Sequence, residues 1–99
     1  MGSIDPEKIQ FIEAMIKASF QCDQINSKAD DIVTEFLFND GTVGYHLLIA
    51  RRFLDNAKTV KTLGTRLQIL DVVNWLKQNP YKTVYLNGDG RISVTPLKR

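Results

Sequence analysis

Beyond Pro80 the spacing of the apolar residues changes from helical to alternating, and this change constrains the fold more than any other feature. Two β-prone runs, residues 83–86 and 91–95, flank the turn sequence NGDG at residues 87–90. Asn-Gly and Asp-Gly pairs readily adopt the positive backbone angles that tight hairpin turns require. The sequence therefore predicts a C-terminal β-hairpin, and Pro96 is expected to end its pairing.

Before Pro80, apolar residues recur three or four positions apart, which is typical of helices. A first helix is expected to begin at Asp5 and Pro6, which suit a helix start, and to run to about residue 22. Further helices are expected over residues 42–56, 59–67 and 69–79, on the apolar series Val43, Leu47, Ala50, Phe53 and Leu54, the series Val60, Leu63 and Leu67, and the series Ile69, Val72, Val73 and Leu76.

Residues 27–40 fit two structures. Ser27 and Asp30 have the spacing of a helix start, and apolar residues that follow them would line one helix face. Residues 32–38 also alternate as in a strand, and the NDG sequence at residues 39–41 suits a hairpin turn. The helix is the preferred interpretation, and the strand alternative would turn residues 31–52 into a β-hairpin.

From residue 42 to residue 95 the expected order is helix, short helix, helix and hairpin. Residues 58–67 are similar to the second helix of the winged helix-turn-helix family, residues 70–79 to its third helix, and residues 88–94 to the tip and outgoing strand of its wing. The resemblance implies a mainly α fold with a C-terminal β-hairpin, winged-helix-like over residues 42–95. Residues 1–40 would be an N-terminal helical extension of the same single domain, since 99 residues leave no room for a second core. The alternative is an α+β fold of two helix–hairpin units.

The same resemblance implies that the chain binds duplex DNA, as a transcriptional or replication regulator. A helix in the major groove would read bases through Asn74 and Gln78, side chains that can bond adenine. Asp71 on the same helix opposes this, because a carboxylate repels phosphate. The basic residues expected to contact phosphate are Lys58, Lys61, Arg66, Lys77, Lys82 and Arg91.

The distribution of charge agrees with an anionic partner. Residues 1–49 carry eight acids and three lysines, whereas residues 50–99 carry ten bases and three aspartates. Such an asymmetry favours a polyanion partner for the second half. It equally suits an acid–base interface within the chain, or head-to-tail association of copies.

A second function competes with DNA binding, namely a non-enzymatic protein-interaction module such as an adaptor, an inhibitor or an assembly subunit. The apolar stripe of the first helix is wider than one neighbour would cover, which indicates a deep groove or a homodimer contact. Phe11 and Met15 on this stripe, and the outward-facing Trp75, are the residues expected to bind a protein partner.

Enzymatic and metal chemistry have little support in the sequence. One histidine and one cysteine, His46 and Cys22, exclude an internal disulfide and an all-Cys/His zinc site. No acid–base constellation or phosphate-binding loop is present, so we expect no enzyme activity, no cofactor and no metal. The apolar runs are too short for a membrane helix, and cysteine usage favours the cytoplasm.

Overall fold

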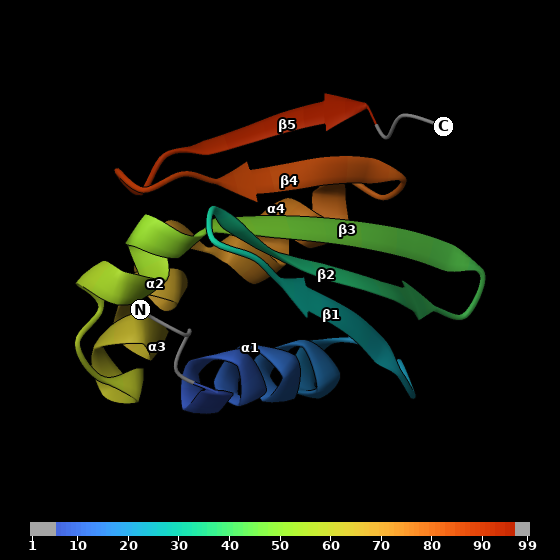
Figure 1. The fold of residues 1–99 in the computed structure, drawn as a ribbon. Coiled ribbons are helices and arrows are strands. Elements are labelled where there is room, and N and C mark those ends of the chain that lie inside the picture. The colour runs from blue at the N-terminus through green and yellow to red at the C-terminus, as the bar shows by residue number, and fades with distance from the viewer. Residues whose placement is uncertain (1–5, 97–99) are drawn as a thin grey trace.

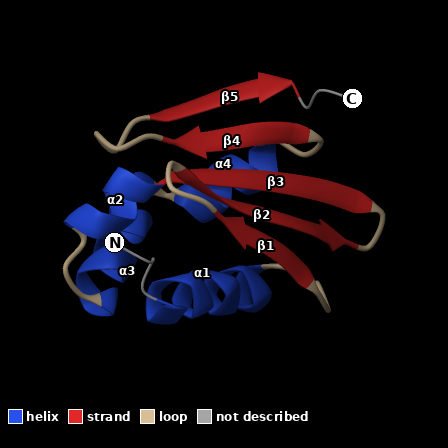
Figure 2. Cartoon of the chain, viewed as in Figure 1, coloured by secondary structure: helices blue, strands red, loops and turns tan. Residues whose placement is uncertain are grey.

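A computed structural model describes residues 6–96 of the chain, in the order α1 (Pro6–Ser19), β1 (Ile25–Ala29), β2 (Val33–Asp40), β3 (Val43–Ala50), α2 (Arg51–Asn56), α3 (Val60–Leu70), α4 (Val72–Gln78), β4 (Lys82–Leu86) and β5 (Ile92–Pro96). The five strands form one mixed sheet in chain order, β1-β2-β3-β4-β5 (Figures 1 and 2). Strands β3 and β4 are parallel, and the other neighbours are antiparallel. The segment that connects β3 to its parallel neighbour β4 contains α2, α3 and α4. No helix of the described residues is long and apolar enough to cross a membrane.

One face of the sheet carries the hydrophobic core. Phe36, Leu47 and Val84 lie side by side across β2, β3 and β4, and all three are fully buried. The four helices pack on this face through buried apolar residues, namely Ile12 and Ile16 of α1, Phe53 and Leu54 of α2, Leu63 and Leu67 of α3, and Val72 and Leu76 of α4. The molecule therefore has two layers, one of helices and one of strands.

An aromatic cluster joins the end of α1 to the β2–β3 hairpin. The ring centroid of Phe20 lies 5.0 Å from that of Phe38 and 4.8 Å from that of Tyr45. The ammonium group of Lys77 lies over the Phe20 ring at 5.4 Å, within the range of a cation–π contact. Burial raises the pKa of Tyr45, and the nearby Asp40 carboxylate adds to that shift.

The mainly α, winged-helix-like fold expected from the sequence is wrong. Helix and strand account for 42% and 34% of the described residues, and the sheet has five strands. Residues 43–50 form β3 where a helix was expected, and residues 33–40 form β2 where a helix was preferred. The strand alternative for residues 31–52 is thus confirmed as far as Ala50, and α2 begins at the next residue, Arg51. The C-terminal hairpin is also confirmed, but it forms the edge of the sheet (Figure 1).

The misreading of β3 has a physical cause. Strand β3 lies in the middle of the sheet, and Tyr45, Leu47 and Ile49 enter the core while Leu48 on the other face is also apolar. A central strand of this kind reads as a nearly continuous apolar run, which contains helical spacings by chance. Strand β1 was missed for the opposite reason, since its polar residues at the sheet edge carry little periodic signal.

The expected helices before and after the central strands are confirmed, with shifted ends. Helix α1 ends at Ser19, and the residue expected to begin it, Asp5, lies outside the described residues. Helix α3 continues through the expected turn at residues 68–69 to Leu70. The break comes at Asp71, whose backbone is left-handed, with φ of 59°. Asp is one of the few residues that tolerate this conformation.

Candidate functional site

The second face of the sheet has no helix over it in the part of the chain that the structure describes (Figure 2). Alternate strand residues point to it because side chains in a strand alternate between the two faces. We call this surface the open face. Two of its rows, read from β1 to β5, are Lys28, Glu35, Leu48, Tyr85 and Ser93, and then Asn26, Leu37, His46, Thr83 and Thr95.

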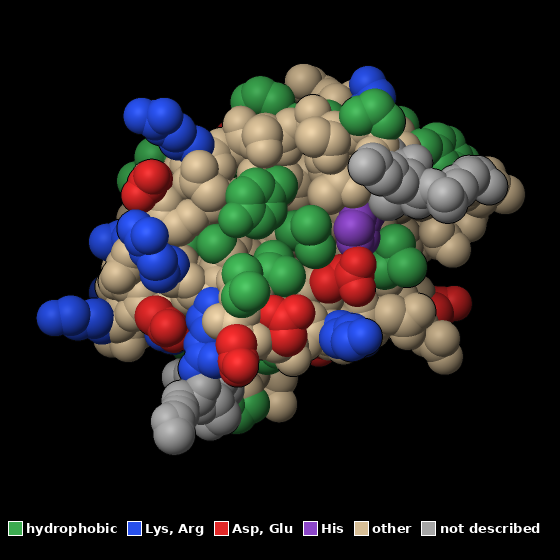
Figure 3. All heavy atoms as spheres, turned by 45° about the horizontal axis from the view of Figure 1, so that its top comes forward, with side chains coloured by type: hydrophobic (Ala, Val, Ile, Leu, Met, Phe, Trp, Pro, Cys, Tyr) green, Lys and Arg blue, Asp and Glu red, His purple; other side chains and the backbone are tan. Residues whose placement is uncertain are grey.

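Apolar side chains gather on the open face and at its end. Ile32 and Leu37 are 76% and 42% exposed. Val33, Leu48 and Tyr85 are half-buried. Figure 3 shows hydrophobic side chains together in the middle of this face, with acidic side chains beside them and the single histidine at one side. We call Ile32, Val33, Leu37, Leu48 and Tyr85 the apolar patch. A contiguous patch of this kind commonly marks an interaction site.

The patch includes the parallel pair of strands. Leu48 of β3 is the register partner of Tyr85 of β4. Sheets made only of parallel strands have both faces covered almost without exception, and antiparallel sheets can leave one face to solvent. In this mixed sheet the described helices cover one face only, and the parallel pair places the apolar Leu48 and Tyr85 on the other face.

A hydrogen-bonded network crosses the open face beside the patch. His46 Nε2 lies 2.5 Å from Oε2 of Glu35, and His46 Nδ1 lies 2.7 Å from Oγ1 of Thr83. A carboxylate only accepts hydrogen bonds, so Nε2 donates to Glu35. In the neutral ring Nδ1 then accepts from the Thr83 hydroxyl. The ring is held on both sides, and it fixes the position of a carboxylate whose side chain is 40% exposed.

The order Thr, His and Glu resembles the arrangement of a nucleophile, a base and an orienting acid. Thr83, however, is only 9% exposed and lies within β4, which is paired with a strand on each side. Its neighbourhood therefore offers no pair of free backbone N–H groups for an oxyanion. Among the described residues no group of three His, Cys, Asp or Glu could hold a metal ion. The network therefore serves best to orient Glu35.

Two hollows lie at the two ends of the open face. One of about 850 Å³ is lined by Leu37, His46, Asn39 and Tyr81, and by Asp23 and Asp40. The other, of about 500 Å³, is lined by Ile32, Tyr85 and Ala50 together with the charged residues Asp31, Arg51, Arg52, Asp55 and Asp89. The apolar patch connects these hollows, since Leu37 belongs to the first and Ile32 and Tyr85 belong to the second.

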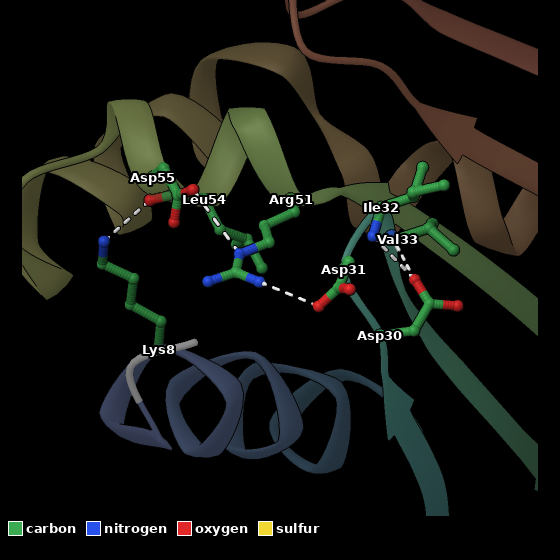
Figure 4. Close-up of polar contacts among 8 residues, drawn as sticks. All are labelled: Lys8, Asp30, Asp31, Ile32, Val33, Arg51, Leu54 and Asp55. Atoms are coloured by element: carbon green, nitrogen blue, oxygen red, sulfur yellow. Dashed lines mark hydrogen bonds and ion pairs between the residues drawn. The ribbon is translucent and has the colours of Figure 1, made fainter. Parts of the chain in front are cut away.

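The β1–β2 turn presents Ile32 at the edge of the open face (Figure 4). Oδ1 of Asp30 accepts hydrogen bonds from the backbone N–H groups of Ile32 and Val33, both at 2.8 Å. These bonds stabilise the carboxylate, so the pKa of Asp30 is lowered from its ordinary value of 3.8. The carbonyl of Ile32 accepts from the backbone N–H of Arg51 at 2.8 Å. Ile32 is therefore exposed on a well-fixed backbone.

Helix α2 anchors this turn and α1 to each other (Figure 4). The Arg51 guanidinium, 17% exposed, lies 3.7 Å from Asp31 and 3.6 Å from Asp55. Lys8 of α1 is 7% exposed, and its Nζ donates to the backbone carbonyl of Leu54 at 2.7 Å. A cation at the last turn of a helix is favourable because carbonyl groups there lack partners.

The eight residues predicted to bind DNA fall into two groups. In the first group, Arg66 lines a hollow of about 240 Å³ together with Gly88 and Gly90 of the β4–β5 turn, and Arg91 follows that turn. Lys58 and Lys61 lie near the start of α3. The sequence analysis missed Arg52, whose side chain lies against Gly88 and whose Nη2 is 3.4 Å from Oδ1 of Asp89.

The second group lies on α4 and at the start of β4. Asn74, Lys77 and Gln78 are exposed on α4, and Lys82 begins β4. Lys82 pairs with Pro96, whereas Arg91 precedes Ile92 at the opposite end of the hairpin. The structure brings Arg66 and Arg91 to one turn, and it separates both from Lys82.

The residues predicted to bind a protein partner are also divided. Phe11 and Met15 are half-buried and line a groove of about 310 Å³ with Gly64 and Val73 of the neighbouring helices. The ring of Phe11 lies so close to Gly64 that a Cβ there would be 2.8 Å from Cζ. Trp75 is 41% exposed on α4 and does not line this groove. The wide stripe of α1 is thus covered largely by the sheet and α3.

Cys22 lies between α1 and β1 and is half-buried. Burial is the main cause that raises the pKa of its thiol. Thiolate is the reactive form, so a raised pKa makes Cys22 a poor nucleophile at neutral pH.

Sequence reasoning missed most of the open face. Ile32, Leu48 and Tyr85 were read as parts of helices or of an isolated hairpin, and Glu35 and His46 were not connected. The alternation of residues 32–38 was the available signal, because it puts Val33, Glu35 and Leu37 on one side of a strand.

No family model, curated protein or solved structure matches this chain.

Proposed function

We propose that this chain is a non-enzymatic protein-interaction module that binds its partner through the open face. The observation that carries the proposal is the parallel pair β3–β4, whose apolar side chains Leu48 and Tyr85 lie on the face that no described helix covers. Ile32 and Leu37 extend the same surface to the two hollows. A protein partner would supply the missing layer and bury the apolar patch.

The size of the patch indicates how the partner must bind. Completing the burial of five partly exposed apolar side chains contributes roughly 5 kcal/mol. Micromolar affinity requires about 8 kcal/mol, after the cost of association. The partner must therefore also contact the polar groups around the patch, and Glu35 and the charged residues of the hollows are available for this.

The chain offers a matched pair of variants for testing this proposal. Ile32 on the open face and Ile69 on α3 are 76% and 77% exposed, so replacing either by Ser removes a similar apolar surface. We would select a random peptide display library against the immobilised wild-type chain. Selected peptides should lose at least tenfold in affinity for Ile32→Ser and should bind Ile69→Ser as they bind the wild type. Equal binding to both variants, or no enrichment, would contradict the proposal.

A second candidate function, binding of duplex nucleic acid, is favoured by one observation. Arg66 and the β4–β5 turn line the same hollow, and Arg91 and Arg52 lie beside that turn. Asp89 in the turn opposes it, since its carboxylate is 70% exposed and already pairs with Arg52. This candidate predicts that log affinity for random duplex falls linearly with log salt concentration. Replacing Arg66 and Arg91 by Ser should lower the slope by about two, whereas Lys82→Ser should leave it unchanged.

A further inference from the structure

We infer that the partner element is a cationic amphipathic α-helix of about 16 residues, which lies along β2, β3 and β4 as a third layer. This inference rests on the proposed function and names the kind of partner that the open face fits. The juxtaposition that carries it is an apolar patch between two hollows, around which the described residues place more carboxylates than cations.

The backbone of the open face favours a helix over an extended segment. Strands β2, β3 and β4 each have a neighbour on both sides, so their backbone N–H and C=O groups are already paired. An added strand lying on this face would find no hydrogen-bond partners for its own backbone there. A helix satisfies its backbone bonds internally and offers side chains alone, which is what this face can receive.

The length of the surface sets the length of the helix. The two hollows lie at opposite ends of β3, which has eight residues. Its seven steps of about 3.3 Å from residue to residue span roughly 23 Å. A helix rises about 1.5 Å per residue, so about 16 residues reach from one hollow to the other. Its apolar stripe would rest on Leu48, Val33 and Tyr85 between them.

The charge around the patch selects a cationic helix. Among residues 6–96, six carboxylates lie on the open face or line its hollows, and they outnumber the cations Lys28, Arg51 and Arg52 by three; they are Asp23, Asp31, Glu35, Asp40, Asp55 and Asp89. Arg51 and Arg52 already pair with carboxylates of this set. Glu35 is held by His46 through one oxygen, which leaves its other oxygen for a Lys or Arg of the partner.

The same charges oppose a second copy of this chain as the occupant. A two-fold dimer through the open face would bring identical surfaces together, and their surplus of carboxylates would meet. Like charges across an interface disfavour association. We therefore expect the chain to stay monomeric through this face at low ionic strength.

Two display libraries of 16-residue peptides test the inference. One carries helix-forming residues with randomised apolar and charged positions, and the other carries Pro at every fourth position so that no helix can form. We expect enrichment only from the helical library, with a net positive charge in the selected sequences. Their affinity should fall about three- to fivefold for Glu35→Gln, which keeps an acceptor for His46, and should not change for Asp71→Asn on the helix side.

The outcomes separate the inference from the proposed function. Extended or anionic peptides that bind and that Ile32→Ser weakens would overturn the cationic helix while the protein-interaction function stands. The inference would also fail if sedimentation showed a dimer that Leu48→Asp, but not Ile69→Ser, dissociates, since the occupant would then be a second copy. If none of the selected peptides lost affinity for the Ile32→Ser variant, both the cationic helix and the protein-interaction function would be overturned.

Discussion

Leu48 and Tyr85 lie next to each other on the parallel strands β3 and β4, and both side chains point to the face that no described helix covers. On the other face of the same strands, Leu47 and Val84 are neighbours and are completely buried. The central strands therefore carry apolar residues on both faces, but the helices within residues 6–96 form a layer on only one of them. The difference between these two faces underlies the proposed function.

Substitutions of two consecutive leucines should measure this difference. Leu47→Ala removes a fully buried side chain and leaves a cavity, so it should lower the free energy of unfolding by about 2–5 kcal/mol. Leu48→Ala on the open face should lower it by less than about 1.5 kcal/mol, because its side chain is only half-buried. Urea denaturation measures both values. Equal losses would mean that the open face is packed like the core.

Lys8 should be important for stability although it is charged. Its Nζ donates to the carbonyl of Leu54 within a buried contact between α1 and α2. Lys8→Met keeps much of the apolar stem but removes the donor, and should cost about 1.5–3 kcal/mol of unfolding free energy. Lys17→Met, at an exposed position of the same helix, is the control and should change stability by less than about 0.5 kcal/mol. A small change in unfolding free energy at both positions would show that the contact between Lys8 and the Leu54 carbonyl does not stabilise the fold.

Replacing Thr34 of β2 and Thr83 of β4 by Val should change the free energy of unfolding in opposite directions. Oγ1 of Thr34 is buried and has no hydrogen-bond partner among the described residues, so Thr34→Val should raise the free energy of unfolding by about 1 kcal/mol. The Thr83 hydroxyl bonds His46, so Thr83→Val should lower it by about 1–2 kcal/mol. Thermal denaturation of both variants gives the sign. Destabilisation by Thr34→Val would show that its hydroxyl is satisfied.

The hydrogen bonds to Asp30 that hold the β1–β2 turn should contribute less to folding stability in acid. Backbone N–H groups of Val33 and Ile32 lower the pKa of Asp30 below its ordinary value of 3.8, so the charged form is favoured in the folded state. The stability that this adds is present above the unfolded value and is lost as pH falls through the folded pKa. Asp30→Asn, which cannot titrate, should therefore be less stable than the wild type at pH 6, and the difference should shrink towards pH 2.5. A constant difference in the urea midpoint across this range would contradict the assignment.

The parts of the fold that the sequence predicts are those with local signals. The NGDG turn between alternating residues is sufficient for the β4–β5 hairpin, and Val60, Leu63 and Leu67 are sufficient for α3. Strand β3 could not be predicted in this way, because its character depends on the parallel partner β4, some 37 residues later. Its apolar run permits a helix until that pairing is known.

The candidate site depends on the same long-range pairing. His46 bonds Glu35 on the preceding strand and Thr83 on the following one in the sheet, and the latter contact spans the three intervening helices. The resemblance to a winged helix instead directed attention to basic residues on α3 and α4 and near the β4–β5 turn. The structure distributes those residues over two places, so their common occurrence in the second half of the chain did not indicate one surface.

Mapping a bound peptide onto the chain would show whether the open face is the binding surface. The strongest peptide from the helical library would be titrated into the ¹⁵N-labelled protein, and amide chemical shifts would be followed in two-dimensional spectra. If the open face binds the peptide, the largest shifts occur at Ile32, Leu37, Leu48 and Tyr85, with little change at Arg66, Ile69 and Trp75. Shifts concentrated on α3, α4 or the β4–β5 turn, with the open face unchanged, would contradict binding at the open face.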